Sequence, residues 1–446
     1  MQNESFNSNN LLKNMVKLLI PLIITNSLSV LTYLINSVWI GRLIGENGVA
    51  SIANCYPMTV VVSSVIIAFA SAISVLVSQY YGAKQKEKIK GLIGCSYIFS
   101  SILGIIIAII IIIFTDKYLQ LLSTPEIVFN DSKAYLTLYS IAFIFNFVLL
   151  IVSESIRALG NTKIPLIFVA IETIINIVAV PILIIAGLGI TGVALANVLA
   201  KLIVMIIAII YVNKKCEMLK VNKNYLKVDT YFLKKILTVG IPVLIEQYVI
   251  AIVITVETSI SNKSGVIGSA SYGVVARWEQ IFLVLSQSIQ TVITILIGQY
   301  IGKGKMDKIH FIIINGLKLS AIPTMFICLV VFAFPSKFCS IFVNSNEVIE
   351  MAVRYLSVVG FAYILMPIRL MFNGFVIGTA HTNFLFFSSI TSSILEVIVM
   401  FSLLNGNNMN SMICLGFSVL TYVLTDTILN FGFYFSGIWK KKIISN

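Results

Sequence analysis

The chain has 446 residues, of which 58% are hydrophobic and only 11% are charged. Ordinary soluble domains are about 45–50% apolar and roughly 25% charged. This composition therefore excludes a water-soluble enzyme, a disordered protein and a secreted disulfide scaffold. The mean hydropathy of +0.99 places the chain in a lipid bilayer.

The net charge of +13 comes largely from lysines in short connections between apolar runs. Such connections are typical of the cytoplasmic loops of membrane proteins. We expect them to meet membrane lipid and not nucleic acid. Most basic residues fall on one side when the runs alternate across the bilayer, so we expect a multi-pass protein of the cell (plasma) membrane with both termini cytoplasmic. We also expect a monomer.

The apolar runs are unbroken, which predicts helices rather than the alternating strands of a membrane barrel. A helix needs about 20 apolar residues to cross the bilayer, so the sequence predicts an all-α protein with twelve transmembrane helices. In chain order the predicted spans are residues 16–40, 53–80, 91–114, 134–158, 164–186, 190–212, 236–260, 270–300, 309–334, 351–376, 383–404 and 411–436.

The Lys-rich segment 213–235 separates two halves of six predicted helices each. We interpret it as a cytoplasmic linker between an N-terminal lobe, residues 1–212, and a C-terminal lobe, residues 236–446. The halves repeat each other at a nearly constant spacing, because Pro21 recurs as Pro242 and the segment QYYG, ending at Gly82, recurs as QYIG, ending at Gly302. An even number of helices in each half makes these parallel repeats, with an expected central cavity between the lobes near the midplane.

Motifs for catalysis or resident metals do not occur in the sequence. The six cysteines are dispersed without a CxxC pair, and the two histidines cannot form a metal site alone. There is no phosphate-binding loop and no nucleophile motif. We therefore expect no enzyme activity, no metal site and no cofactor other than a coupling ion.

Four segments resemble signatures of the multidrug and toxic compound extrusion (MATE) family: IPLIITNSLSVLTYLINSVWIGRLIG, QYYGAKQKEKIKG, RALGNTKIP and INIVAVPILIIAGLGITGVALANVLA. The resemblance covers nearly the whole chain, from about Leu12 to Ile438. It implies twelve helices in two six-helix lobes around a cavity. It also implies export of organic, often cationic, compounds in exchange for sodium ions or protons.

Two positions depart from the family pattern. Relatives with a carboxylate-based amino-terminal lobe usually have an Asp where this chain has Asn36, and a second Asp where it has Val180. Asn176 does match the pattern. The usual coupling carboxylates of that lobe are therefore absent, and their role cannot be transferred to this chain.

Glu257 is the first candidate for a substrate or coupling-ion site. At the spacing that relates Pro21 to Pro242, it is the counterpart of Asn36 and so takes, in the second lobe, the place of the missing Asp. Glu246 lies three turns earlier on nearly the same helix face. Because ionisable groups cost about 2.5–3.5 kcal/mol at the centre of a membrane helix, each is a functional candidate. The alternatives for Glu257 are an ion pair with Lys263 or Arg277 and a solvated position at the rim.

The first lobe has two further charged candidates. Glu172 and Asn176 lie four residues apart on one helix face. Together with Asn36 they are candidates for the substrate or coupling-ion site. Glu154 and Arg157 lie three residues apart, and for them a structural salt bridge is favoured because both can reach the interface.

The candidate charge network is completed by Arg277, Glu279, Arg369 and Asp426. Arg277 and Glu279 are two residues apart and cannot share a helix face. Arg369 is expected to partner an acid rather than the substrate. For Asp426 and for Glu396 a packing role and a substrate role are equally compatible with the sequence.

The favoured function is a secondary transporter that exports organic, cationic or drug-like compounds by antiport with H+ or Na+ through alternating access. The alternative is a lipid-linked oligosaccharide flippase of a related class, which needs cationic residues to bind pyrophosphate. Its candidates are Lys201, Arg277, Lys318 and Arg369, and seven intramembrane acids compete with them. That balance favours the export of cations.

Overall fold

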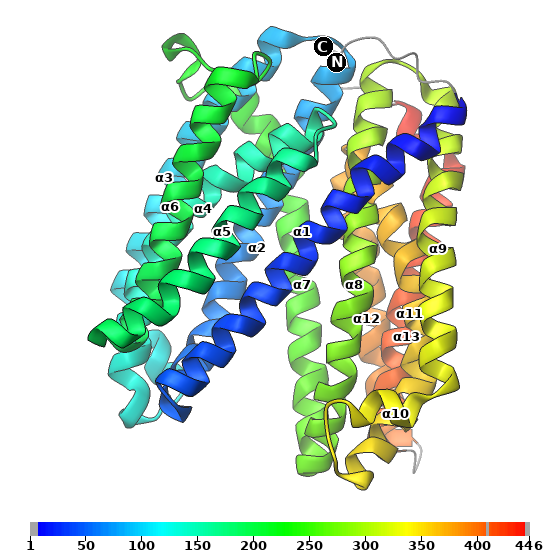
Figure 1. Ribbon diagram of the computed structural model, residues 1–446. Helices are drawn as coiled ribbons and strands as arrows, with labels where there is room; N and C mark the ends of the chain where they lie inside the picture. Colours follow the sequence, from blue (N-terminus) through cyan, green and yellow to red (C-terminus); the bar gives the residue numbers. More distant parts are fainter. Residues whose placement is uncertain (1–7, 407–409, 442–446) are drawn as a thin grey trace. The chain divides into compact units, whose positions relative to one another are not determined.

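The computed structural model describes residues 8–406 and 410–441, and every long element in these two ranges is a helix (Figure 1). Twelve of the thirteen α-helices in this part of the chain are long, and α10 has six residues. The helices are α1 (Ser8–Leu43), α2 (Glu46–Gly82), α3 (Lys86–Leu121), α4 (Glu126–Ala158), α5 (Lys163–Leu183), α6 (Gly189–Lys215), α7 (Thr230–Lys263), α8 (Gly265–Gly302), α9 (Ile309–Ala333), α10 (Pro335–Ser340), α11 (Asn346–Gly378), α12 (Thr382–Gly406) and α13 (Ser411–Ser436).

Eleven continuous helical stretches among the described residues are long and apolar enough to cross a membrane. One of them, residues 163–215, is 53 residues long and includes the π-helical turn η1 (Ile184–Leu188). Gly187 in this turn has φ 90°, a left-handed conformation that glycine adopts without steric cost. The turn separates α5 from α6. The all-α fold is thus confirmed, and the break at Gly187 yields the twelve predicted spans.

Several helices extend beyond the apolar runs that predicted them. α2 begins at Glu46, seven residues before the predicted span, and α11 begins at Asn346, five residues before. Hydropathy detects only the part of a helix in hydrocarbon, whereas the backbone hydrogen bonds continue into the polar end turns. The short helix α10 was not predicted. It begins at Pro335, a residue that suits the first turn of a helix.

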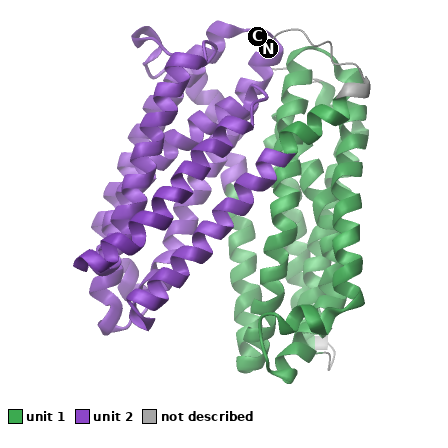
Figure 2. Cartoon of the chain, in the orientation of Figure 1, with its two compact units in different colours: residues 1–19, 245–446 green, residues 20–244 purple. Residues whose placement is uncertain are grey.

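The chain divides into two compact units, shown in different colours in Figure 2. We call residues 20–244 the amino-terminal unit, and the residues up to Leu19 together with those from Ile245 onward the carboxyl-terminal unit. Helices α1 and α7 each contribute residues to both units. The predicted lobe and linker boundaries, and the cavity between the lobes, stay predictions.

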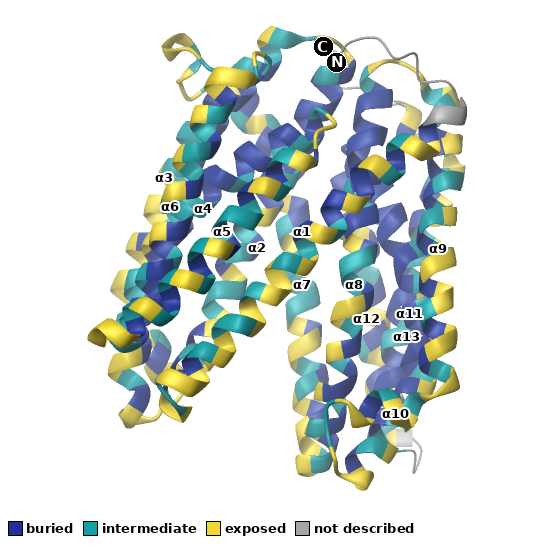
Figure 3. Cartoon of the chain, in the orientation of Figure 1, coloured by how far each residue is buried: buried dark blue, intermediate teal, exposed yellow. Residues whose placement is uncertain are grey.

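Each unit has a pair of central helices that are buried more than their neighbours (Figure 3). α2 packs against α4 in the amino-terminal unit, and α8 packs against α11 in the carboxyl-terminal unit. The same hydrogen bond joins both pairs: the hydroxyl of Ser74 donates to the backbone oxygen of Glu154 at 3.5 Å, and that of Thr294 to Gly374 at 3.0 Å. The spacing that relates Gly82 to Gly302 also relates these two bonds, so the repeat in sequence is a repeat in packing.

The segment between α6 and α7 packs on the start of α3 within the amino-terminal unit. Lys86 forms a 2.5 Å ion pair with Glu217, and the Tyr225 hydroxyl hydrogen-bonds Glu87. The Lys86 ammonium lowers the pKa of the Glu217 carboxyl by donating this hydrogen bond. A Cβ at Gly94 would lie 2.1 Å from the backbone oxygen of Tyr225, so glycine is needed for this close approach. The segment is therefore fastened to α3.

Candidate functional site

Five acidic side chains lie inside the carboxyl-terminal unit, on four of its helices. Asp426 is completely buried, Glu246, Glu257 and Glu396 are at most 6% exposed, and Glu279 is partly exposed. Carboxylates are seldom buried unless they are paired. Their partners therefore decide what this cluster can do.

Glu257 on α7 is bound by two neighbours. The Tyr272 hydroxyl donates to its Oε2 at 2.9 Å, and the carboxyl group of Glu396 on α12 interacts with it electrostatically. Two neighbouring carboxylates repel each other when both are ionised, so the pair favours a state in which one of them carries a proton. Glu279 acts electrostatically on Glu396 from α8. Glu257, Glu279 and Glu396 thus form a small cluster of interacting acids, which favours bound protons.

The alternative partners expected for Glu257 lie elsewhere. No ion pair among the described residues joins Glu257 to Lys263 or Arg277. Arg277 is exposed, with its guanidinium 5.3 Å from the ring centre of Phe342, so it does not join the acid cluster. Glu279, two residues further, points to a different face and does belong to the cluster, as their spacing predicts.

Arg369 on α11 has the acidic partner that the sequence predicts. Its Nη1 lies 3.3 Å from Oδ2 of Asp426 on α13, and its guanidinium is 4.9 Å from the ring centre of Tyr422. Asn430 donates to Oδ1 of Asp426 at 2.9 Å and also contacts the side-chain oxygen of Asn373 at 2.9 Å. These contacts hold the Asp426 carboxylate in place and compensate its burial.

Four of the five acids inside the carboxyl-terminal unit have no ion-pair partner in the part of the chain that the structure describes. They are Glu246, Glu257, Glu279 and Glu396. Glu246 is placed near the Arg369–Asp426 pair, with which it interacts electrostatically. Because Arg369 is already paired with Asp426, it does not neutralise these four acids. The acids can therefore accept additional positive charge.

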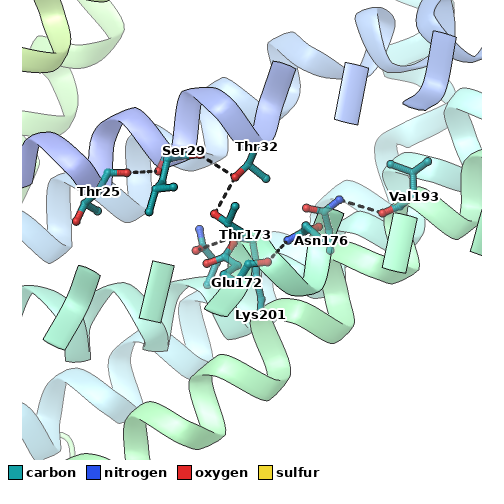
Figure 4. A network of polar contacts seen from close by, with 11 residues as sticks. Thr25, Ser29, Thr32, Glu172, Thr173, Asn176, Val193 and Lys201 are labelled. Carbon is teal, nitrogen blue, oxygen red and sulfur yellow. Dashed lines mark hydrogen bonds and ion pairs between the residues drawn. The ribbon is translucent and has the colours of Figure 1, made fainter. Parts of the chain in front are cut away.

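The amino-terminal unit uses its polar residues differently (Figure 4). Glu172 on α5 forms a 2.9 Å ion pair with the ammonium of Lys201 on α6, which also donates to Oδ1 of Asn146 on α4 at 3.1 Å. Thr32 on α1 and Thr173 on α5 share a 2.8 Å hydrogen bond. Glu172 therefore has an internal cationic partner.

Two amides of this unit have unpaired oxygens. The Oδ1 atoms of Asn36 and Asn176 are buried and have no hydrogen-bond partner among the described residues. Asn176 donates to the backbone oxygen of Glu172 at 3.1 Å. Glu154 and Arg157 form the salt bridge along α4 that their spacing predicts.

Glu396 was undervalued in the sequence analysis. In the repeat it is the counterpart of Asn176, just as Glu257 is the counterpart of Asn36. The repeat therefore indicated that these two carboxyl groups of the second half take the places of two amides of the first half. Among the described residues, no group of three or more His, Cys, Asp or Glu side chains has a geometry that could hold a metal ion.

Comparisons with known proteins agree with the repeat. The MatE family profile matches residues 21–182 and 242–402, one segment in each half. The chain is 28% identical over 361 residues to the probable multidrug resistance protein YoeA of Bacillus subtilis, covering 79% of this chain and 78% of the relative. It is 23% identical over 405 residues to the multidrug export protein MepA of Staphylococcus saprophyticus, covering 90% and 89%.

A solved structure has the same fold. It is described as the outward-facing conformation of a multidrug resistance MATE family transporter of the MOP superfamily. The match has a TM-score of 0.90 at 18% sequence identity, and it covers 99% of this chain and all of the other.

Proposed function

Because this chain belongs to the multidrug and toxic compound extrusion (MATE) family, we propose that it exports organic cations in exchange for H+ or Na+ by alternating access. Its curated relatives carry the names of multidrug resistance and export proteins. We place it in the plasma membrane as a monomer with both termini cytoplasmic.

The observation that carries this proposal is a set of four acids inside the carboxyl-terminal unit. None of the four has an ion-pair partner among the described residues. Uncompensated carboxylates are costly inside a membrane protein, so they favour a bound proton, metal cation or organic cation. When ion and substrate compete for the same negative charge, binding of one releases the other, which is the requirement for exchange. Tyr272, which hydrogen-bonds Glu257, adds an aromatic ring whose face attracts organic cations.

Protons are the favoured coupling ion. Glu257 and Glu396 repel each other when both are ionised, and a proton on either carboxyl removes this repulsion. Exchange of one proton for one monovalent cation moves no net charge, so only the proton gradient would drive it. Two protons per cation would add about 2.3 kcal/mol per 100 mV of membrane potential.

The test is efflux of a cationic dye from proteoliposomes under separately imposed proton and sodium gradients. We expect the wild type to exchange under the proton gradient. Glu257→Gln should lose about tenfold or more of this flux, within the usual range of coupling free energies. Glu350→Gln is the matched control, because Glu350 is an exposed partner of Arg354. Absence of flux under either gradient, or equal flux in Glu257→Gln, would contradict the proposal.

The flippase alternative is not favoured. Lys201 and Arg369, two of its four candidate cations, are neutralised by Glu172 and Asp426. Arg277 is exposed and contacts an aromatic ring. A pyrophosphate group would therefore meet acids rather than free bases in the carboxyl-terminal unit.

A further inference from the structure

We propose that Lys201 is a resident counter-ion, whose ammonium neutralises Glu172 so that the amino-terminal unit takes up no coupling ion. The number of ions exchanged in each cycle is then set by the carboxyl-terminal unit alone. This inference rests on the proposed antiport, which it deepens by assigning the ion to one of the two repeats.

The surroundings of the Lys201 ammonium are those of a bound monovalent cation. Its Nζ is 2.9 Å from the carboxylate of Glu172 and 3.1 Å from the side-chain oxygen of Asn146 (Figure 4 shows the Glu172 contact). The three residues come from α6, α5 and α4. The side chains of Lys201 and Glu172 are only 12% and 22% exposed. Carboxylate and amide oxygens are the ligands that hard cations choose, and here the chain's own ammonium occupies them.

No further charge among the described residues of this unit competes for the ammonium. The groups that act electrostatically on Lys201 are Glu172 and Tyr139. Glu154 on α4, another partly buried acid of this unit, is bound by Arg157 one turn away. The two acids are thus matched by two bases, in contrast to the carboxyl-terminal unit.

A tethered cation differs from a dissolved one because it cannot leave. Removing one partner of a buried ion pair leaves an uncompensated charge, which costs far more than removing both. Without Lys201, the Glu172 carboxylate would therefore recruit a proton or a sodium ion from solution. With Lys201 present, this site has no need of either.

The experiment is a double-mutant cycle on the full-length protein in detergent, with wild type, Lys201→Met, Glu172→Gln and the double variant. Two probes are used: the amount of radioactive sodium ion bound per protein at alkaline pH, and the change in thermal unfolding temperature between acid and alkaline pH, which detects a bound proton. All four proteins keep the acids of the carboxyl-terminal unit. The difference between Lys201→Met and the double variant therefore reports on Glu172 alone.

We expect Lys201→Met to bind one more monovalent cation, Na+ or H+, than the double variant, and the wild type to bind no more than the double variant. Equal binding by Lys201→Met and the double variant would overturn the proposal. If Lys201→Met does not fold, recovery of folding in the double variant supports a role in charge compensation. Failure of the double variant as well would show that Lys201 acts through packing, which also overturns it.

These readouts use no transported substrate. If the wild type exchanges no cation in proteoliposomes, the proposed antiport is wrong, and the binding cycle still decides whether Lys201 is a counter-ion. If exchange occurs but Lys201→Met gains no ion, only this further inference fails.

Discussion

The two units place different chemistry at equivalent positions of one repeat. Asn36 and Asn176 of the amino-terminal unit correspond to Glu257 and Glu396 of the carboxyl-terminal unit. The amide oxygens are buried with no hydrogen-bond partner in the described chain, whereas the two carboxyl groups interact electrostatically with each other. A repeated backbone thus fixes where a polar pair lies, and the side chains decide whether the pair can take up charge.

The balance of charge follows the same division. Glu172 and Glu154 of the amino-terminal unit each have a basic partner within the unit. The carboxyl-terminal unit pairs Asp426 with Arg369 and leaves the other four acids of its interior without a base among the residues that the structure describes. Duplication has therefore produced one repeat whose buried acids are neutralised internally and one with capacity for cations.

The largest effect is expected at the carboxyl pair. Glu396→Gln should reduce proton-driven efflux about tenfold or more, as we expect for Glu257→Gln, because the two interacting carboxyls are proposed to take up one proton together. The double variant should be no worse than either single one, since residues that act as a unit are not additive. Proteoliposome efflux under a proton gradient measures this, with Ser392→Ala, one turn earlier on α12, as the control. Additive losses would mean two separate sites.

A second effect concerns the Arg369–Asp426 pair of the same unit. Arg369→Met should lower the free energy of unfolding by about 3–5 kcal/mol, because it leaves the Asp426 carboxylate buried without its base. Adding Asp426→Asn should recover part of that loss. Thermal unfolding in detergent measures both.

The control for this pair is Arg354→Met, which breaks an exposed ion pair with Glu350 and should cost about 1 kcal/mol or less. Equal losses in Arg354→Met and Arg369→Met would show that burial does not make the inner pair important.

The smallest effect is expected at Gly94 on α3, whose counterpart on α9 has different surroundings. Gly94→Ala on α3 should lower the free energy of unfolding by about 1–3 kcal/mol, because the new Cβ would overlap the backbone of Tyr225. Ile314 stands at the equivalent position on α9, where a side chain is accommodated. Thermal unfolding measures this free energy. An unchanged value in Gly94→Ala would show that the segment between α6 and α7 moves away from α3 without cost.

The sequence supplied much of the site but not its contacts. Local spacing predicted the Glu154–Arg157 bridge, and the cost of buried charge predicted an acid for Arg369. The alternative pairing of Glu257 with Lys263 or Arg277 was not found among the described residues. Helical spacing tells which residues share a face of one helix, but it does not tell which helix packs against that face.

Composition, apolar length and the constant spacing between the halves by themselves determined a membrane protein of twelve helices in two repeated halves, because hydrocarbon admits few other structures. Tertiary structure alone decided which charges meet. Asp426 reaches Arg369 from another helix, Lys201 reaches Glu172, and Glu396 reaches Glu257 across a long stretch of chain. Such contacts depend on how helices pack, and interhelical distance is a quantity that linear spacing does not contain.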